Sequence, residues 1–228
     1  MREQIERIAE AFAEGLRRVV GRKLHGCYIY GAAAFPDDLP TGDFPPPGGE
    51  LDGYYLLLSD ARRRRPPQSQ MWNNARDQSW ALHCAHIRAG RFIALHGPNP
   101  RTIYPHPTRP AIRRALAGEL RYVEDHLHHV PHYCILQLCR LVYSQESGDV
   151  VVSKARASEW ARGEFAEWRW LIELARNAYA GLTSPEDADR MRSEVTAFLQ
   201  VARVRIDHVR HRPLRPAGEG GRLEQSGS

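Results

Sequence analysis

Long apolar runs are missing from this chain of 228 residues. No stretch approaches the roughly 18 consecutive apolar residues that a membrane-spanning helix needs, which argues against an integral helical membrane protein. Residues 1–7 are charged from the second position onward and contain no apolar signal core. The sequence therefore predicts a cytoplasmic protein with no membrane partner.

Cysteine is also scarce, and the four cysteines form neither a CxxC pair nor the spacing of a disulfide framework. Cys134 and Cys139 lie in an apolar stretch, where a free thiol behaves as a small hydrophobic side chain. Four histidines gather over residues 126–132, but only those three or four positions apart share a helix face. No cysteine or acid accompanies them at a zinc-site spacing, so we expect packing rather than metal binding.

Acidic residues are fewer than basic ones. The sequence has 27 Asp and Glu and 32 Lys and Arg, which gives a net charge of +5. Residues 62–65 are an arginine run beside two prolines, which is typical of a solvated loop. Further arginines accumulate near the end of the sequence, at Arg203, Arg205, Arg210, Arg212, Arg215 and Arg222. No motif of interleaved aromatic and basic residues accompanies this charge, so we expect no nucleic-acid partner.

The first 72 residues combine helix and strand patterns. Apolar side chains recur every 3.6 residues over 3–20, which predicts an amphipathic helix. Residues 27–30 and 50–58 are β-type runs, and the segment 32–49 between them holds five prolines. Residues two apart on a strand point to the same side. The carboxylates of Glu50 and Asp52 are therefore expected to share one face of the second strand.

The remaining chain is predicted to be helical almost to its end. A helix is expected over 73–89, and Thr108 is a predicted N-cap of the next one. Pro131 opens a helix that is apolar nearly all round, which places it at the centre of a bundle. Later helices are predicted to start at Ser153, to cover 165–180, and to start at Ser184-Pro185.

These patterns predict an α+β protein. A small, incomplete mixed sheet is expected in a domain over residues 1–72, followed by a helical domain over 73–208. Residues 209–228 contain too little apolar surface to offset the entropy of ordering, so a disordered tail is expected.

Four short motifs between residues 134 and 181 follow one another in a fixed order. They are Ile135-Leu-Gln-Leu-Cys-Arg-Leu-Val-Tyr143, Ser153-Lys154, Glu159-Trp160-Ala161 and Ala178-Tyr179-Ala180-Gly181. In order, spacing and residue type, this segment resembles the C-terminal domain of the streptomycin/spectinomycin adenylyltransferases. The resemblance implies a nucleotidyltransferase that moves AMP from MgATP to a hydroxyl of an aminoglycoside-like small molecule.

The same resemblance assigns nucleotide contacts to Lys154 and Tyr179. The chemistry independently requires such groups, because cations must neutralise the phosphates while a carboxylate accepts the hydroxyl proton. Lys154 would stand in the first turn of a helix capped by Ser153, where its charge adds to the positive end of the helix dipole.

The N-terminal part shows a shorter match to the nucleotidyltransferase signature. Tyr30-Gly31-Ala32 stands where the family has a phosphate-binding Gly-Ser turn, which makes Gly31 a candidate nucleotide contact. Asp43 resembles the first aspartate of the metal-binding pair, while Pro45 occupies the position of the second. Asp52 resembles the later carboxylate, so magnesium would be held by Asp43 and Asp52, with Asp52 also a candidate catalytic base.

A second register remains open, in which Glu50 and Asp52 themselves form the metal-binding and catalytic pair. An alternative function also remains open. Ala32, Pro45 and the short interval from Gly31 to Asp52 are compatible with a non-catalytic relative that keeps a nucleotide or ligand cleft. An incomplete sheet would leave an open edge, so either a monomer or a homodimer is expected.

Overall fold

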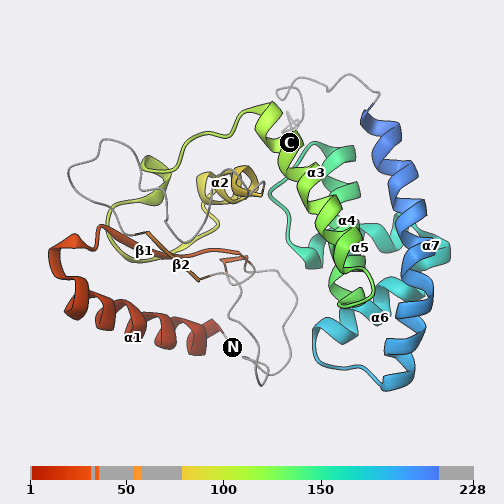
Figure 1. Ribbon diagram of the computed structural model, residues 1–228, viewed down its shortest axis with the longest axis horizontal. Helices are drawn as coiled ribbons and strands as arrows, with labels where there is room; N and C mark the ends of the chain where they lie inside the picture. The colour runs from red at the N-terminus through yellow and green to blue at the C-terminus, as the bar shows by residue number, and fades with distance from the viewer. Residues whose placement is uncertain (1, 32–33, 36–53, 58–78, 211–228) are drawn as a thin grey trace, which may run out of the picture.

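The computed structural model describes residues 2–31, 34–35, 54–57 and 79–210. The α+β class predicted from the sequence is confirmed, with a small sheet at one end of the molecule and a helical bundle at the other (Figure 1). The sheet end contains α1 (Arg2–Val20), β1 (Gly26–Ile29), β2 (Tyr54–Leu57) and β3 (Ile93–His96). Helix α2 (Trp80–Arg88) lies between this end and the bundle (Figure 1).

The sheet has the strand order β2-β1-β3, so β1 lies in the middle. Both pairings are antiparallel: Cys27 lies opposite Leu56 on β2, and Tyr28 opposite Ala94 on β3. A mixed sheet was predicted, but the described strands contain no parallel pair, because both neighbours run opposite to β1. The predicted domain boundary at residue 72 assigned β3 to the helical domain, whereas its hydrogen bonds join it to the sheet.

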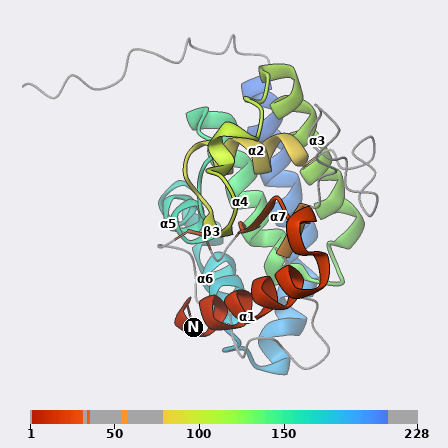
Figure 2. The same cartoon turned by 90° about the vertical axis from the view of Figure 1, so that its left-hand side faces the viewer.

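Helix α1 packs on the sheet through its small residues. Ala9 and Ala13 are buried, and Ala9 forms a small core with Ile29 of the central strand. The predicted amphipathic helix over 3–20 is therefore present, and Figure 2 shows it running along the sheet end of the molecule. Tyr30, which directly follows β1 in the sequence, packs with Cys84 and Ile87 of α2 and so joins the sheet to that helix.

The bundle is built around one helix. It contains α3 (Arg109–His126), α4 (Pro131–Ser147), α5 (Lys154–Glu164), α6 (Arg169–Tyr179) and α7 (Pro185–Arg210). Helix α4 contacts each of the other four, and residues 134–139 are all buried. This agrees with the central position predicted from its all-round apolar sequence. None of the helices in the described part of the chain is both long and apolar enough to cross a membrane.

The predicted helix starts are confirmed by their caps. The hydroxyl of Thr108 accepts a hydrogen bond from the amide of Ala111 at 3.3 Å, and Ser153 accepts one from Arg156 at 3.1 Å. Ser184 accepts from Asp187 at 3.1 Å. Each bond satisfies a backbone N–H that has no partner within its helix. Local sequence therefore determines where these helices begin.

The end of α7 is fastened to the bundle by Arg205. Its guanidinium donates to Glu146 of α4 at 2.6 Å and to Glu164 of α5 at 3.1 Å. It also lies over the ring of Phe165, 4.9 Å from the centroid. Three segments distant in sequence therefore meet at this one side chain. The predicted disordered tail falls mainly on residues 211–228, which lie outside the described residues.

Candidate functional site

Lys154 is the first residue of α5 and its ammonium is enclosed by aromatic side chains. The side chain is only 7% exposed. Its Nζ donates a hydrogen bond to the hydroxyl of Tyr179 at 3.3 Å and lies 5.1 Å from that ring's centroid. On the other side, the ring of Tyr133 is 5.2 Å away. Helices α4 and α6 therefore each contribute one aromatic side chain beside the cation that α5 carries.

No carboxylate within the described residues forms an ion pair with Lys154. A buried ammonium is costly unless it is paired or hydrogen-bonded, so this environment is only partly compensated. The two aromatic faces attract the cation, and the Tyr179 hydroxyl accepts one of its protons. The capped start of α5 adds further positive potential at the same point. The arrangement favours an anionic ligand beside Lys154.

Tyr133 links Lys154 to a second group of polar side chains on α3 and α4. Burial raises the pKa of the Tyr133 phenol, while the charges of Lys154 and Arg140 oppose that shift and Glu119 reinforces it. The amide of Gln137 donates to Glu119 at 2.6 Å, and its carbonyl accepts from Arg140 at 3.3 Å. Arg140 has no ion pair among the described residues, so it is a second cation close to the site.

Gln137, Arg140 and Val150 also line a small cavity between α2, α3 and α4. Its space is about that of a single water molecule, far below the 300 Å³ or more of a typical ligand pocket. The cavity therefore cannot accommodate a nucleotide.

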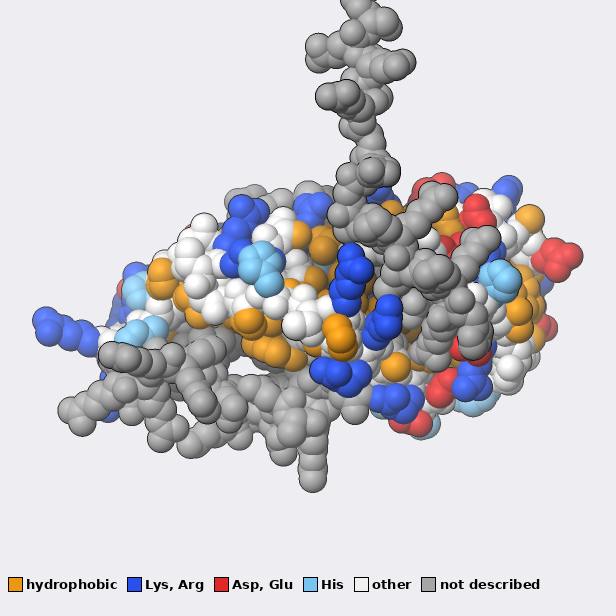
Figure 3. All heavy atoms as spheres, turned by 90° about the horizontal axis from the view of Figure 1, so that it is seen from above, with side chains coloured by type: hydrophobic (Ala, Val, Ile, Leu, Met, Phe, Trp, Pro, Cys, Tyr) orange, Lys and Arg blue, Asp and Glu red, His pale blue; other side chains and the backbone are white. Residues whose placement is uncertain are grey.

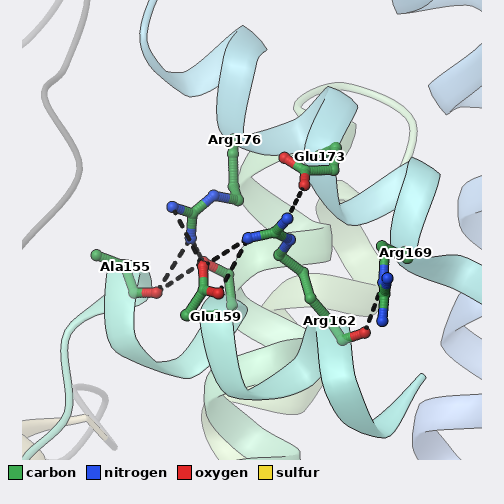
Figure 4. Close-up of polar contacts among 7 residues, drawn as sticks. Ala155, Glu159, Arg162, Arg169, Glu173 and Arg176 are labelled. Carbon is green, nitrogen blue, oxygen red and sulfur yellow. Dashed lines mark hydrogen bonds and ion pairs between the residues drawn. The ribbon is translucent and has the colours of Figure 1, made fainter. Parts of the chain in front are cut away.

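An arginine network fixes α5 against α6, the two helices that supply Lys154 and Tyr179 (Figure 4). Arg176 donates to the carbonyl of Ala155 at 3.1 Å and to the hydroxyl of Ser158 at 2.6 Å. Beside it, Arg162 pairs with Glu159 of its own helix at 2.8 Å and with Glu173 of α6. Arg176 precedes Tyr179 by almost one helical turn, and Ala155 directly follows Lys154. The network therefore sets the spacing between the two site residues.

Replacing Arg176 with methionine is expected to lower the free energy of unfolding by about 1–2 kcal/mol. The hydrogen bonds of a charged donor are lost, and partial solvent exposure reduces their value. Urea denaturation measures this change. Arg192→Met is the matched control, because the ion pair of Arg192 with Asp189 lies on an exposed surface. Its effect should stay within about 0.5 kcal/mol, and an equal loss in both variants would contradict a special role for Arg176.

A long stretch of the chain ahead of α4 carries only positive charge. Between Asp77 and Glu119 the sequence has no acidic residue, whereas it has the arginines Arg88, Arg91, Arg101, Arg109, Arg113 and Arg114. In Figure 3, acidic side chains gather toward the right of the view, and Lys, Arg and His predominate over the described surface on the left and in the centre. A surface with one sign of charge raises the local concentration of ligands of opposite charge.

The structure describes only part of the site predicted from the sequence. Lys154 and Tyr179 come together across 25 residues of sequence. Gly31 lies two residues after the end of β1 and has a positive φ of 84°. Its carbonyl accepts a hydrogen bond from the amide of Ala34 at 3.0 Å, so it opens a turn beyond the strand. The carboxylate residues Asp43, Glu50 and Asp52 lie outside the described residues. Within the described ranges no three His, Cys, Asp or Glu side chains gather as a metal site.

Sequence reasoning missed Tyr133 and Arg140 as members of this site. Arg140 belongs to the apolar motif of α4, where a single arginine among buried neighbours was an available signal. Tyr133 follows Pro131 in the first turn of the same helix, and nothing local indicates that its ring faces Lys154. Its contact with α5 depends on how α4 and α5 pack.

A known protein family matches part of the helical half of the chain. No curated protein sequence matches the chain. The family profile described as the aminoglycoside adenylyltransferase C-terminal domain matches residues 107–204. The matched stretch runs from the cap of α3 into α7 and includes Tyr133, Lys154 and Tyr179. Over these residues the chain is similar to the C-terminal helical domain of the aminoglycoside adenylyltransferases.

Proposed function

We propose that the protein is a nucleotidyltransferase that binds MgATP and transfers AMP to a hydroxyl of an aminoglycoside-like small molecule. The observation that carries this proposal is the buried ammonium of Lys154, which is held by two tyrosines and has no carboxylate partner among the described residues. A phosphate group would supply the missing negative charge. Charge-assisted contacts of this kind are among the stronger hydrogen bonds in proteins.

The described residues would act on the nucleotide's phosphates. Lys154 neutralises negative charge that grows as the phosphoryl group is transferred, and the helix start at Ser153 adds to the same field. Tyr179 keeps the ammonium in place through its hydroxyl and its ring. Arg140 provides additional positive potential from α4. These groups are held by helix packing before the ligand arrives, which reduces the reorganisation that the reaction requires.

The carboxylate half of the proposed site rests on the sequence alone. Asp43 and Asp52 are the proposed magnesium ligands, and Asp52 or Glu50 the group that accepts the acceptor's hydroxyl proton. A bound magnesium ion would neutralise phosphate charge. Gly31 contributes to the proposal as the turn that would approach a phosphate, because a glycine backbone allows close contact.

A second candidate function is nucleotide binding without transfer. It is favoured by Pro45, which stands at the position of an expected metal-binding aspartate, and by Ala32 in place of a phosphate-binding serine. A site with one metal ligand fewer would hold its second ion weakly. The nucleotide contacts of Lys154 and Tyr179 would be the same in both candidates.

Incubation with labelled ATP, magnesium and either streptomycin or spectinomycin distinguishes the two candidates. Because Pro45 replaces a carboxylate, we expect transfer to be far slower than the ~1–1000 per second of typical enzymes. Mass spectrometry of the drug, which gains one AMP group on transfer, is the measurement. ATP-dependent thermal protection, measured on the same sample, reports binding independently.

The control reaction contains EDTA, which should remove any product that depends on magnesium. Slow product formation supports the transferase. Thermal protection without product supports the nucleotide-binding relative. Absence of both would overturn the nucleotide-site assignment itself.

A further inference from the structure

His86 on α2 is a buried side chain that joins the sheet half of the molecule to the bundle. It is 4% exposed. Its Nε2 lies 2.9 Å from the carbonyl oxygen of Val150, in the loop that leads from α4 to α5. Its ring also meets the ring of Phe35 edge-on, with centroids 5.2 Å apart. Phe35 lies four residues after Gly31, and Val150 lies four residues before Lys154. His86 therefore contacts a residue close in sequence to each of these two predicted nucleotide contacts.

The chemistry of the contact fixes the state of the imidazole. A carbonyl oxygen only accepts hydrogen bonds, so Nε2 must carry the proton. Burial and the nearby charge of Arg140 lower the pKa of His86 to about 3, which keeps the ring neutral at physiological pH. In that state Nδ1 is an acceptor, and it has no hydrogen-bond partner among the described residues. The hydrogen bond from Nε2 to the Val150 carbonyl is therefore the one that the His86 ring makes with the described residues.

Val150 stands four residues before Lys154. Two hydrogen bonds hold this loop. The carboxylate of Asp149, just before Val150, accepts from the amide of Val151 at 2.8 Å, and the hydroxyl of Ser153 caps α5. Lys154 is close enough to His86 for its charge to affect the imidazole's titration. The carbonyl of Val150 is therefore connected to the start of α5 by a short loop that carries its own hydrogen bonds. Leu82, one turn earlier on α2, packs into the bundle core but makes no such directional bond.

We propose that His86 is a positioning residue for the nucleotide site: its hydrogen bond to Val150 holds Lys154 in place relative to the turn at Gly31. The binding readout of this inference rests on the proposed function. Small displacements of a charged group reduce an interaction that depends on alignment, whereas apolar packing tolerates them. His86 would therefore affect binding of the phosphates more than binding of the nucleoside.

Substituting His86 with glutamine or asparagine tests whether the position of the hydrogen-bond donor matters, because both side chains are polar amides but place their nitrogen differently. The side-chain nitrogen of glutamine can occupy the place of Nε2, whereas that of asparagine reaches only the place of Nδ1. We expect His86→Gln to bind MgATP within about threefold of the unmodified protein and His86→Asn to bind it about tenfold more weakly. Adenosine, which lacks phosphates, should bind both variants alike. Calorimetric titration of each ligand is the measurement.

His83→Asn is the matched control, because His83 lies on the same helix and its Nε2 meets Ser79 instead of the bundle. It should leave MgATP affinity unchanged. Equal MgATP affinities in the folded His86→Gln and His86→Asn variants would overturn the inference. Equal weakening for MgATP and adenosine would also overturn it, since that pattern marks a general loss of structure.

Hydrogen exchange keeps the inference testable if the unmodified protein binds no MgATP, a result that would contradict the proposed function instead. Backbone amides over residues 150–156 should then exchange faster in His86→Asn than in His86→Gln, because the loop has lost its anchor. Equal exchange in the two variants would show that His86 does not hold the start of α5.

Discussion

Replacing Lys154 with methionine is expected to weaken MgATP binding about 10- to 100-fold, the equivalent of roughly 1.5–3 kcal/mol for a charge-assisted phosphate contact. Methionine keeps the aliphatic stem between Tyr133 and Tyr179 but removes the charge. Removing one member of a buried ion pair usually leaves an unpaired charge behind. Lys154 has no carboxylate partner among the described residues, so the substitution should not destabilise the protein in this way.

This loss is measured as reduced thermal protection by MgATP. Lys23 is a convenient control, because it is exposed at the end of a short 3-10 helix and is the only other lysine in the sequence. Lys23→Met should retain full protection. Undiminished protection of Lys154→Met would exclude Lys154 from the nucleotide site.

Truncating Phe198 to alanine is expected to lower the free energy of unfolding by about 3–5 kcal/mol, the range for large aromatic residues in a core. Phe198 of α7 is fully buried, and its ring lies 5.6 Å from those of both Phe165 and Trp168. The substitution leaves a cavity where α5, α6 and α7 meet, and these aromatic contacts are lost as well. Urea denaturation gives the value.

Val204→Ala, on the same helix but 71% exposed, is the comparison for Phe198. It should change stability by no more than about 0.5 kcal/mol. Below the unfolding transition, Phe198→Ala should still bind MgATP, since the ammonium of Lys154 is held by Tyr133 and Tyr179. A loss below about 1 kcal/mol would mean that the bundle closes around the cavity far more readily than its packing implies.

The bundle was largely predictable because its signals are local. Thr108, Ser153 and Ser184 each cap a helix by accepting from the amide three positions ahead, and the apolar surface of α4 is visible in its own sequence. One prediction failed where tertiary packing prevailed. Residues 165–180 were predicted as one helix, but the chain forms a 3-10 turn over Ala166–Trp168 before α6 begins. That turn places both Phe165 and Trp168 against Phe198.

The site was less predictable, because its contacts join distant segments. His86 and Val150 are 64 residues apart, and the Lys154–Tyr133 contact crosses two helices. Neither sequence neighbourhood contains a signal for the other. Lys154 and Tyr179 were identified through the resemblance to a family and not through spacing, since a lysine in the first turn of a helix is usually solvated. Packing between helices decides which of these side chains meet.

The contacts of Arg205 with α4 and α5 determine where a fragment containing only the helical domain should end. The family match ends at residue 204, one position before Arg205 and two before the buried Ile206. A fragment cut at that limit would lose the bonds to Glu146 and Glu164 and would leave both carboxylates without their guanidinium. The last turns of α7 would then fray, and the aromatic surface around Phe165 would become open to solvent. A stable fragment should therefore extend beyond the end of the family match, to the end of α7 at Arg210.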